Sequence, residues 1–494
     1  MTLTVVCPVR TEAGPARRAA TTAVVSRCGM GADRARRWER SAPDGPRAVL
    51  GVAGALADGI APGDVVVADR VIDGTLPDAD CGVALASAST IAAQLRRLGL
   101  TVHVGPVVSV ERTATGDRRS ALMATGALAV DMESAWLVDG GSTHAVVRVI
   151  VDTPDHELWR PSLPGRLLRA RRTIGATVAP LEQWAAALGD REVILPSPRS
   201  FCAGVDRAID VVHRALADRG APVYVRRQVV HNTRVVAELA DAGAVFVDEL
   251  DEVPDGGTVV FAAHGVSPQV RAEAQRRDLP VIDATCPLVA KVHREARRFA
   301  DEGLQILLIG HADHEEVEGT SAETPMTVID PSVDVATIDV VDPDRVAYLT
   351  QTTLAVAEVD ETVARLRDRF PAIVGPRADD ICFATQNRQA AVIAIAPDCD
   401  LILVAGSANS SNSMRLAEVA RREGVEAHLV DDPDDVDLTW LAGARVVGVT
   451  AGASAPESLV TDLVARLGSL GTVVITERAV VDETVRFPLP AEVR

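Results

Sequence analysis

Short apolar runs rich in valine, isoleucine and leucine alternate with longer runs rich in alanine, arginine and glutamate along the whole chain. The short runs have the length of strands buried on both faces. The longer runs place apolar residues three and four positions apart, which is typical of amphipathic helices. The strand-like runs include RAVLGVAG, DVVVADRVI, LQILLIG, AAVIAIA and DLILVAGS. This alternation predicts an α/β fold whose sheets are largely parallel.

The chain of 494 residues is long enough for more than one domain. The clearest boundary lies near residues 186–191. There the helical segment ATVAPLEQWAAAL ends at Gly189-Asp190, and a new strand begins at Glu192. We therefore divide the chain into residues 1–188 and residues 191–494.

Composition excludes several classes of protein. Aromatic residues make up 3% of the chain and the net charge is −19, which argues against a nucleic-acid-binding surface. Seven scattered cysteines do not form the pattern of a disulfide framework. The opening MTLTVVCPVR does not resemble a signal peptide, and no apolar run is long enough to span a membrane. We expect a cytoplasmic protein.

Three cysteines share one context in the second part of the chain. Cys202 lies between the strand-like EVILPSP and the helix-like AGVDRAIDVVHRAL, and Cys286 precedes another helix-like segment, PLVAKVHREARRFA. Cys382 stands at a similar junction, between GPRADDI and FATQNRQAAVIAIA. The carboxyl end of a strand is where α/β sheets bind ligands, and a helix N-terminus favours a thiolate. The pattern predicts three similar α/β units that each deliver one thiolate, although a lone cysteine can also be a small buried apolar residue. The remaining cysteines lack this context: Cys7, Cys28, Cys81 and Cys399.

Polar residues cluster at loop-like positions in the same part of the chain, mostly after apolar runs, so we expect them at strand ends. They are His231, His264, His314, Glu316, Thr352, Ser410, Ser411, Asn412 and Ser454. Imidazole, hydroxyl and amide donors in an acidic protein suit a small, highly charged anion such as a phosphate. Each residue taken alone could instead be structural, for example as a helix cap. Their occurrence together with the three cysteines favours an anion site.

The order of these motifs resembles that of a known family. RSFCAGVDRAI, VVHN, AAHGVS, DATCPLVAKVH, EVEGT, TQTTL, DDICFATQNRQ, SANSSNS and TAGASAPE occur in sequence. Over residues 191–470 they closely resemble the 4-hydroxy-3-methylbut-2-enyl diphosphate reductases, which fold as three α/β units around an iron–sulfur cluster. The chain departs from the usual pattern at Ser200 for glycine, at Asp313-His314-Glu315 for Gly-His-Pro and at Gln386 for threonine. None of these changes replaces a residue that the family uses for chemistry.

The resemblance implies a site and a reaction. Cys202, Cys286 and Cys382 would bind a 4Fe–4S cluster with one open iron that can act as a Lewis acid. The diphosphate of an allylic substrate would be held by His231, His264, Ser410, Ser411, Asn412 and Ser454. His314 would stand near the substrate and the proton source, and Glu316 with Thr352 would relay the proton that releases water. Two electrons, from a donor such as ferredoxin or flavodoxin, and two protons would yield isopentenyl or dimethylallyl diphosphate.

The first part of the chain carries a different set of motifs. GVAGAL, GDVVVA, VDMES and VRVI followed by Asp152 resemble the purine nucleoside phosphorylase and nucleosidase superfamily, and most closely the short hopanoid-associated phosphorylases. The resemblance implies that Glu133 binds ribose hydroxyls, that Met132 packs on the sugar and that Asp152 protonates the purine leaving group. Gly29 and Gly31 would let the backbone approach phosphate or ribose, with Arg10 and Arg148 as candidate phosphate ligands. Phosphorolysis, hydrolysis and mere nucleoside binding all remain open.

Three functional classes follow from the two resemblances. The chain could be a bifunctional enzyme, a reductase with a nucleoside-binding or assembly domain, or an iron–sulfur redox sensor. Glu316 and Thr352 argue against a sensor, because a sensor needs thiolates but no proton relay. Asp152 and Glu133 favour an active first domain.

Overall fold

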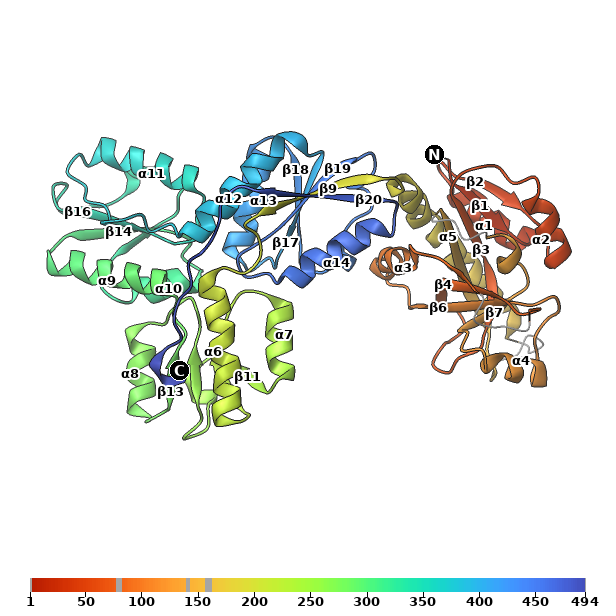
Figure 1. Ribbon diagram of the computed structural model, residues 1–494, viewed down its shortest axis with the longest axis horizontal. Helices are drawn as coiled ribbons and strands as arrows, with labels where there is room; N and C mark the ends of the chain where they lie inside the picture. Colours follow the sequence, from red (N-terminus) through yellow and green to blue (C-terminus); the bar gives the residue numbers. More distant parts are fainter. Residues whose placement is uncertain (1, 77–81, 139–142, 156–161, 494) are drawn as a thin grey trace. The chain divides into compact units, whose positions relative to one another are not determined.

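The computed structural model describes residues 2–76, 82–138, 143–155 and 162–493 (Figure 1). Cys81 lies outside these residues. The chain forms two compact units. The first contains Met1–Glu192, Pro433–Arg445 and Val464–Val474, and the second contains Val193–Asp432, Val446–Leu463 and Ile475–Arg494. Two short segments from late in the sequence therefore belong to the first unit, which a division in chain order does not express.

The first unit is built on an eight-stranded sheet. Its strands are β1 (Thr4–Cys7), β2 (Val24–Arg27), β3 (Arg47–Ala55), β4 (Val65–Asp73), β5 (Val83–Ala84), β6 (Val102–Ser109), β7 (Ala129–Asp131) and β8 (His144–Asp152). The strands β3, β8, β4, β6 and β7 pair in a closed ring, and the β3–β7, β4–β5 and β4–β8 pairs are antiparallel. This sheet is therefore mixed, less parallel than the alternation predicts.

The helices of the first unit are α1 (Arg10–Ala19), α2 (Ala32–Glu39), α3 (Ala88–Arg97), α4 (Gly116–Met123) and α5 (Leu163–Ala187). The core is formed by apolar strand residues such as Val49, Val66 and Val146, which are fully buried. The helix α5 ends one residue before the position expected from the sequence, with Leu188 as its cap. Within the described residues, no helix combines the length and hydropathy needed to cross a membrane.

The second unit contains three lobes, each with its own sheet. The first lobe has β10 (Val223–Arg226), β11 (Ala244–Val247), β12 (Val259–Phe261) and β13 (Val281–Asp283), and the second has β14 (Gln305–Ile309), β15 (Thr327–Ile329) and β16 (Val346–Thr350). The third has β9 (Arg191–Ser197), β17 (Leu401–Ala405), β18 (Glu426–Val430), β19 (Val446–Ala451) and β20 (Val473–Ala479). The pairings within the first two lobes, and those of β17, are parallel, as predicted.

Three helices cross from one lobe to the next. The helix α6 (Ala203–Arg219) follows β9 of the third lobe and packs on β10 of the first. In the same way α9 (Pro287–Asp301) follows β13 and packs on β14 and β16, and α12 (Phe383–Ile395) leaves the second lobe and packs on β17. The other helices are α7 (Thr233–Asp241), α8 (Pro268–Arg276), α10 (Glu315–Ser321), α11 (Val356–Arg369), α13 (Ser411–Arg422) and α14 (Glu457–Gly468).

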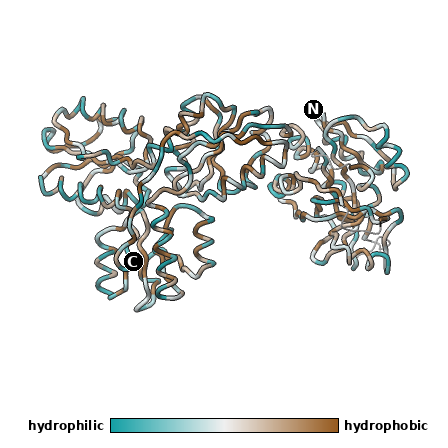
Figure 2. Tube along the Cα trace, viewed as in Figure 1, coloured by the Kyte–Doolittle hydropathy of each residue, from teal (hydrophilic) through white to brown (hydrophobic). Residues whose placement is uncertain are grey.

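Four of the five strand-like runs are confirmed as strands, in β3, β4, β14 and β17. The fifth prediction is wrong, because AAVIAIA forms the end of α12 and the short turn after it. Its residues Ala391, Val392 and Ile395 are buried on the third lobe, and a short apolar run cannot distinguish a buried helix from a buried strand. Figure 2 shows apolar residues concentrated along the strands of each lobe and hydrophilic residues on the outer helices.

Candidate functional site

The three cysteines occupy the same local position in three lobe crossings. Cys202, Cys286 and Cys382 are the N-cap residues of α6, α9 and α12. Their backbone N–H groups donate to Ala453 O at 3.2 Å, Ala263 O at 2.9 Å and Thr352 O at 3.1 Å, respectively. A helix N-terminus places unpaired N–H groups and the positive end of the helix dipole beside each sulfur, which favours a thiolate.

These sulfurs face one cavity of about 100 Å³ in the second unit. All twelve site residues expected in this part of the chain line it: Cys202, Cys286, Cys382, His231, His264, His314, Glu316, Thr352, Ser410, Ser411, Asn412 and Ser454. The polar members follow the strands β10, β12, β14, β16, β17 and β19, as expected for the carboxyl ends of parallel strands. The fold therefore brings together residues that are up to 252 positions apart in the sequence, from Cys202 to Ser454.

Sequence reasoning missed several residues of this site. Thr385 lies one helical turn after Cys382, and its backbone N–H and hydroxyl contact Cys382 Sγ at 3.3 and 3.1 Å. Thr353 donates to Ser411 Oγ at 3.0 Å. The position of Thr385 could have been predicted from the sequence, because it lies three residues after Cys382, and side chains at the N-cap and N3 positions of a helix contact each other.

Three histidines line one wall of the cavity. The rings of His231 and His264 stack with centroids 3.9 Å apart, and His314 packs edge-on at 5.4 Å from His231. Burial and the two neighbouring imidazoles lower the pKa of His231 to about 2, and burial together with His264 lowers that of His314 to about 4. A nearby anion would favour the protonated imidazoles, so the trio can take up protons when an anion binds.

Polar atoms in the cavity wall lack partners. Among the described residues, neither ring nitrogen of His231 and neither amide atom of Asn412 has a hydrogen-bond partner, and both side chains are buried. Ser454 Oγ donates to His231 O at 3.0 Å and lies 3.0 Å from Ser410 Oγ. Buried polar groups are nearly always hydrogen-bonded, so this wall is built for a polar ligand.

Glu316 is 2% exposed and lies at the start of α10. Its carboxylate accepts from Thr352 N at 2.7 Å and from Thr352 Oγ1 at 2.8 Å, and its own N–H donates to His314 Nδ1 at 3.1 Å. Burial raises the pKa of Glu316, which the Thr352 hydrogen bonds partly oppose. A buried carboxyl of raised pKa beside a hydroxyl is suited to holding and delivering a proton.

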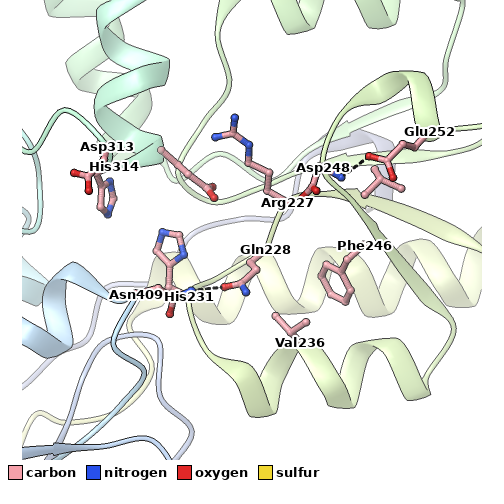
Figure 3. A pocket seen from close by; sticks show the side chains of 12 residues that line it. Arg227, Gln228, His231, Val236, Phe246, Asp248, Glu252, Asp313, His314 and Asn409 are labelled. Atoms are coloured by element: carbon pink, nitrogen blue, oxygen red, sulfur yellow. Dashed lines mark hydrogen bonds between the residues drawn. The ribbon is translucent and has the colours of Figure 1, made fainter.

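A second cavity of about 510 Å³ shares His231 and His314 with the first (Figure 3). In Figure 3 the ring of His231 extends toward His314, and Gln228 lies next to His231. Gln228 accepts from Asn409 at 2.8 Å. Glu315, where the family usually has proline, also lines this cavity and lies 3.5 Å from His264 Nδ1.

The residues present fit a cluster bound by three thiolates. Gly204 has no side chain, and a Cβ there would lie 2.7 Å from Cys286 Sγ and 3.8 Å from Cys202 Sγ, so the glycine leaves room beside both sulfurs. Burial raises the pKa of Cys286 to about 12 and that of Cys382 to about 11. Buried sulfurs of this kind become thiolates only beside a cation, which is what iron supplies. No fourth cysteine of the described residues lines the cavity.

The first unit holds a separate cavity of about 220 Å³, and the three residues expected there, Met132, Glu133 and Asp152, all line it. Burial raises the pKa of Glu133 to about 7, against the opposing effect of Arg148. Asp152 forms a buried ion pair with Arg119 on the cavity wall. Glu12 also lines the cavity and accepts from Val9 N and Val52 N, each at 2.9 Å.

Of the candidate phosphate ligands in the first unit, Arg10 and Gly29 line a cavity, whereas Arg148 does not. Gly29 and Gly31 have φ of 89° and 94°, but Gly31 N donates to Glu133 Oε1 at 2.9 Å. Arg148 lines none of the cavities described here, because Asp131 at 2.5 Å and Ser134 at 2.8 Å hold its buried guanidinium. A cavity of about 720 Å³ adjoins the 220 Å³ cavity at Pro8, Val9 and Met30. Its wall carries Arg10, Arg27, Arg34 and Arg37.

Comparisons with known proteins agree with both halves of this description. Residues 193–468 match the LytB protein family, and residues 10–142 match the Phosphorylase superfamily. The 4-hydroxy-3-methylbut-2-enyl diphosphate reductase of Acidothermus cellulolyticus is 56% identical over 313 residues, covering 63% of this chain and 92% of that protein. The protein of the same name from Bordetella pertussis is 55% identical over 303 residues, covering 61% and 93%.

A solved structure agrees as well. The E-1-hydroxy-2-methyl-but-2-enyl-4-diphosphate reductase from Plasmodium falciparum matches with a TM-score of 0.57 and 35% identity, over 61% of this chain and 96% of that one. Both predicted resemblances are thus confirmed at the level of family. Since the match covers more than half of the chain, and the bacterial relatives are covered over more than nine tenths of their length, this chain belongs to the LytB protein family.

Proposed function

We propose that the second unit reduces 4-hydroxy-3-methylbut-2-enyl diphosphate to isopentenyl and dimethylallyl diphosphate. The observation that carries the proposal is the convergence of three cysteines, three histidines and the Glu316–Thr352 pair on one cavity. Two electrons and two protons enter, the allylic C–O bond breaks, and the oxygen leaves as water. A 4Fe–4S cluster on Cys202, Cys286 and Cys382 would supply the electrons and Lewis acidity at the substrate oxygen.

The protein residues divide the remaining work. The unpartnered nitrogens of His231 and amide of Asn412, with Ser410, Ser411, Ser454 and His264, bind the diphosphate through charge-assisted hydrogen bonds. Glu316 donates the proton that turns a poor leaving group into water. Thr352 holds the carboxyl in place through its N–H and hydroxyl. His314, linked to Glu316 N, stands between the anion site and the proton donor.

A redox sensor remains the competing function for the same cysteines. A sensor does not require polar side chains that bind an anion or a buried proton donor, and this cavity is lined by both. Anaerobic purification with iron and sulfide analysis, followed by a reductase assay with a ferredoxin or flavodoxin as electron donor, tests the proposal. We expect iron and sulfide in the protein and formation of both isomeric products. A protein with a cluster but no turnover would favour the sensor.

For the first unit, we infer that the cavity at Glu133 and Asp152 binds a purine nucleoside and cleaves its glycosidic bond. Glu133 would accept from ribose hydroxyls, Met132 would pack on the sugar, and Asp152 would direct a proton to the purine. The ion pair with Arg119 orients Asp152 and also favours the ionised form of its carboxyl over the protonated form. Assays of purine release from several 5′-substituted adenosines, with and without phosphate, separate phosphorolysis from hydrolysis. Binding without release would leave the unit as a nucleoside-binding domain.

A further inference from the structure

Arg388 is a fully buried cation close to the three cysteines in the fold, but it does not line their cavity. It lies on α12, six residues after Cys382, and is 1% exposed. The guanidinium has five N–H groups, and a buried arginine is costly unless these groups find acceptors. The identity of those acceptors shows what the side chain does.

Three of the six hydrogen bonds that Arg388 donates go to backbone oxygens directly before Cys202. Arg388 Nε and Nη2 donate to Ser200 O at 2.9 and 2.7 Å, and Nη2 also donates to Phe201 O at 3.0 Å. Nη1 donates to Ala384 O, on its own helix, at 3.0 Å. Arg388 therefore ties the loop that ends in Cys202 to the helix that begins at Cys382.

The loop that Arg388 holds is a strained one. Ser200 has a φ of 60°, in the left-handed region that costs a residue with a side chain about 1–2 kcal/mol. Its hydroxyl donates to Glu457 Oε2 at 2.6 Å, so the residue is held by Glu457 on one side and by Arg388 on the other. These contacts offset the cost of a side chain at a position with this backbone conformation.

The charge of Arg388 is balanced by a residue from the end of the chain. Glu483 accepts from Arg388 Nη1 at 3.0 and 3.1 Å and from Asn387 Nδ2 at 3.0 Å. Glu483 belongs to residues 480–493, here called the C-terminal strap, which leaves β20 of the third lobe and ends in the core of the first lobe at Val493 (Figure 1). Arg207 on α6 donates to Pro488 O at 2.8 Å and fastens the strap on the way.

From these contacts we infer that Arg388 is a positioning residue for Cys202, and that Glu483 of the C-terminal strap holds Arg388 in that role. The inference rests on the proposed function, since it concerns the geometry of a group bound by three sulfurs. One guanidinium joins two of the three cysteine junctions, and the strap links it to the core of the first lobe, on which α6 also packs. Outer partners of metal ligands typically change metal affinity by about 10–100-fold when they are removed.

The test compares Arg388→Gln and Arg388→Lys with Arg365→Gln. Arg365 is the matched control, because it also donates to backbone oxygens, Pro331 O and Val333 O, but in the second lobe. In anaerobic holoprotein we expect Arg388→Gln to lose iron to a chelator at least about tenfold faster than wild type and the control. Arg388→Lys keeps the charge but not the fork of donors, so it should lose iron nearly as fast. Wild-type loss rates in Arg388→Gln, or full rescue by lysine, would overturn the inference.

A second readout does not depend on iron. In cluster-free reduced protein, the ratio of the alkylation rates of Cys202 and Cys286 with iodoacetamide, measured by peptide mass spectrometry, should change severalfold in Arg388→Gln and stay constant in the control. An unchanged ratio would overturn the inference even if wild type bound no iron, which would itself defeat the proposed function. If Arg388→Gln does not fold, Glu483→Gln supplies the same comparison, with a smaller change expected in the same direction.

Discussion

Glu316 and Thr352 are joined by two hydrogen bonds, from Thr352 N at 2.7 Å and Thr352 Oγ1 at 2.8 Å, so both carboxylate oxygens are occupied by one neighbour. The neighbour fixes the rotamer of a carboxyl that burial keeps ready to hold a proton. The pair thus supplies orientation and acidity at once.

Replacing Glu316 tests this pair. Glu316→Gln keeps the hydrogen-bonding shape but has no proton to give, so kcat should fall by about 10²–10⁴ while substrate binding and iron content stay near wild type. Steady-state kinetics and iron analysis measure both. The control is Glu318→Gln, two residues away on the same helix, whose carboxylate is half-exposed and pairs with Arg227. Undiminished turnover in Glu316→Gln would move the proton source elsewhere.

The cysteines can be separated by mutation. Cys202→Ser should lose most of the iron and sulfide and turn colourless in air, because serine is a poor substitute for thiolate at iron. Cys399→Ser should keep the full complement of iron and sulfide, since Cys399 lies outside the cavity, partly buried against the core of the third lobe. Equal iron content in the two variants would contradict the assigned ligand set.

The histidine trio makes stability depend on pH. Because the folded pKa values of His231 and His314, about 2 and 4, lie below the ordinary value, the unfolded chain binds more protons below pH 6.5. The two neutral histidines therefore make their full contribution to the free energy of unfolding above pH 6.5, and this contribution falls as the pH drops toward their folded pKa values. When the pH is lowered from 7.0 to 5.5, the free energy of unfolding of His231→Asn should fall by about 1 kcal/mol less than that of wild type.

Denaturant unfolding at the two pH values measures the difference, and the exposed His213→Asn variant is the control. Added inorganic diphosphate should reduce the pH dependence of the wild type, since an anion favours the charged imidazoles. A His231→Asn variant that loses as much stability as wild type would contradict the buried, neutral state of His231.

Ser200 predicts an order of stability. Ser200→Gly loses the hydrogen bond to Glu457 but relieves the left-handed strain, whereas Ser200→Ala loses the hydrogen bond and keeps the strain. The alanine variant should therefore be less stable than the glycine variant by about 1 kcal/mol, seen as a lower thermal midpoint. The opposite order would mean that the loop does not hold this conformation in solution.

Asp152→Asn tests the first unit. The substitution should lower any purine release by about 10²–10⁴, because asparagine cannot donate the proton. It also leaves the buried Arg119 with a weaker partner, so the thermal midpoint must be measured in parallel. Asp155→Asn, exposed and three residues further on, is the control. Equal purine release in the two variants would remove Asp152 from the proposed role.

Much of the second unit could be predicted from the sequence because its signals are local. The strand before Cys202, the helix after it and the polar residues after strands are all encoded within about ten residues. The structure adds what depends on distant contacts: the crossing of α6, α9 and α12 between lobes, and the side chain of Arg388 beneath Ser200. AAVIAIA was misassigned for the same reason, since its partner surface comes from the third lobe. The closed ring of strands in the first unit likewise depends on long-range pairing.

The position of each cysteine at a crossing between two lobes has a consequence for biogenesis. A ribosome that makes the chain from its N-terminus releases Cys202, Cys286 and Cys382 in that order, and the last sulfur is in place only after the second lobe is complete. A centre that needs all three sulfurs can therefore be loaded only after Cys382 has been made and the second lobe has formed.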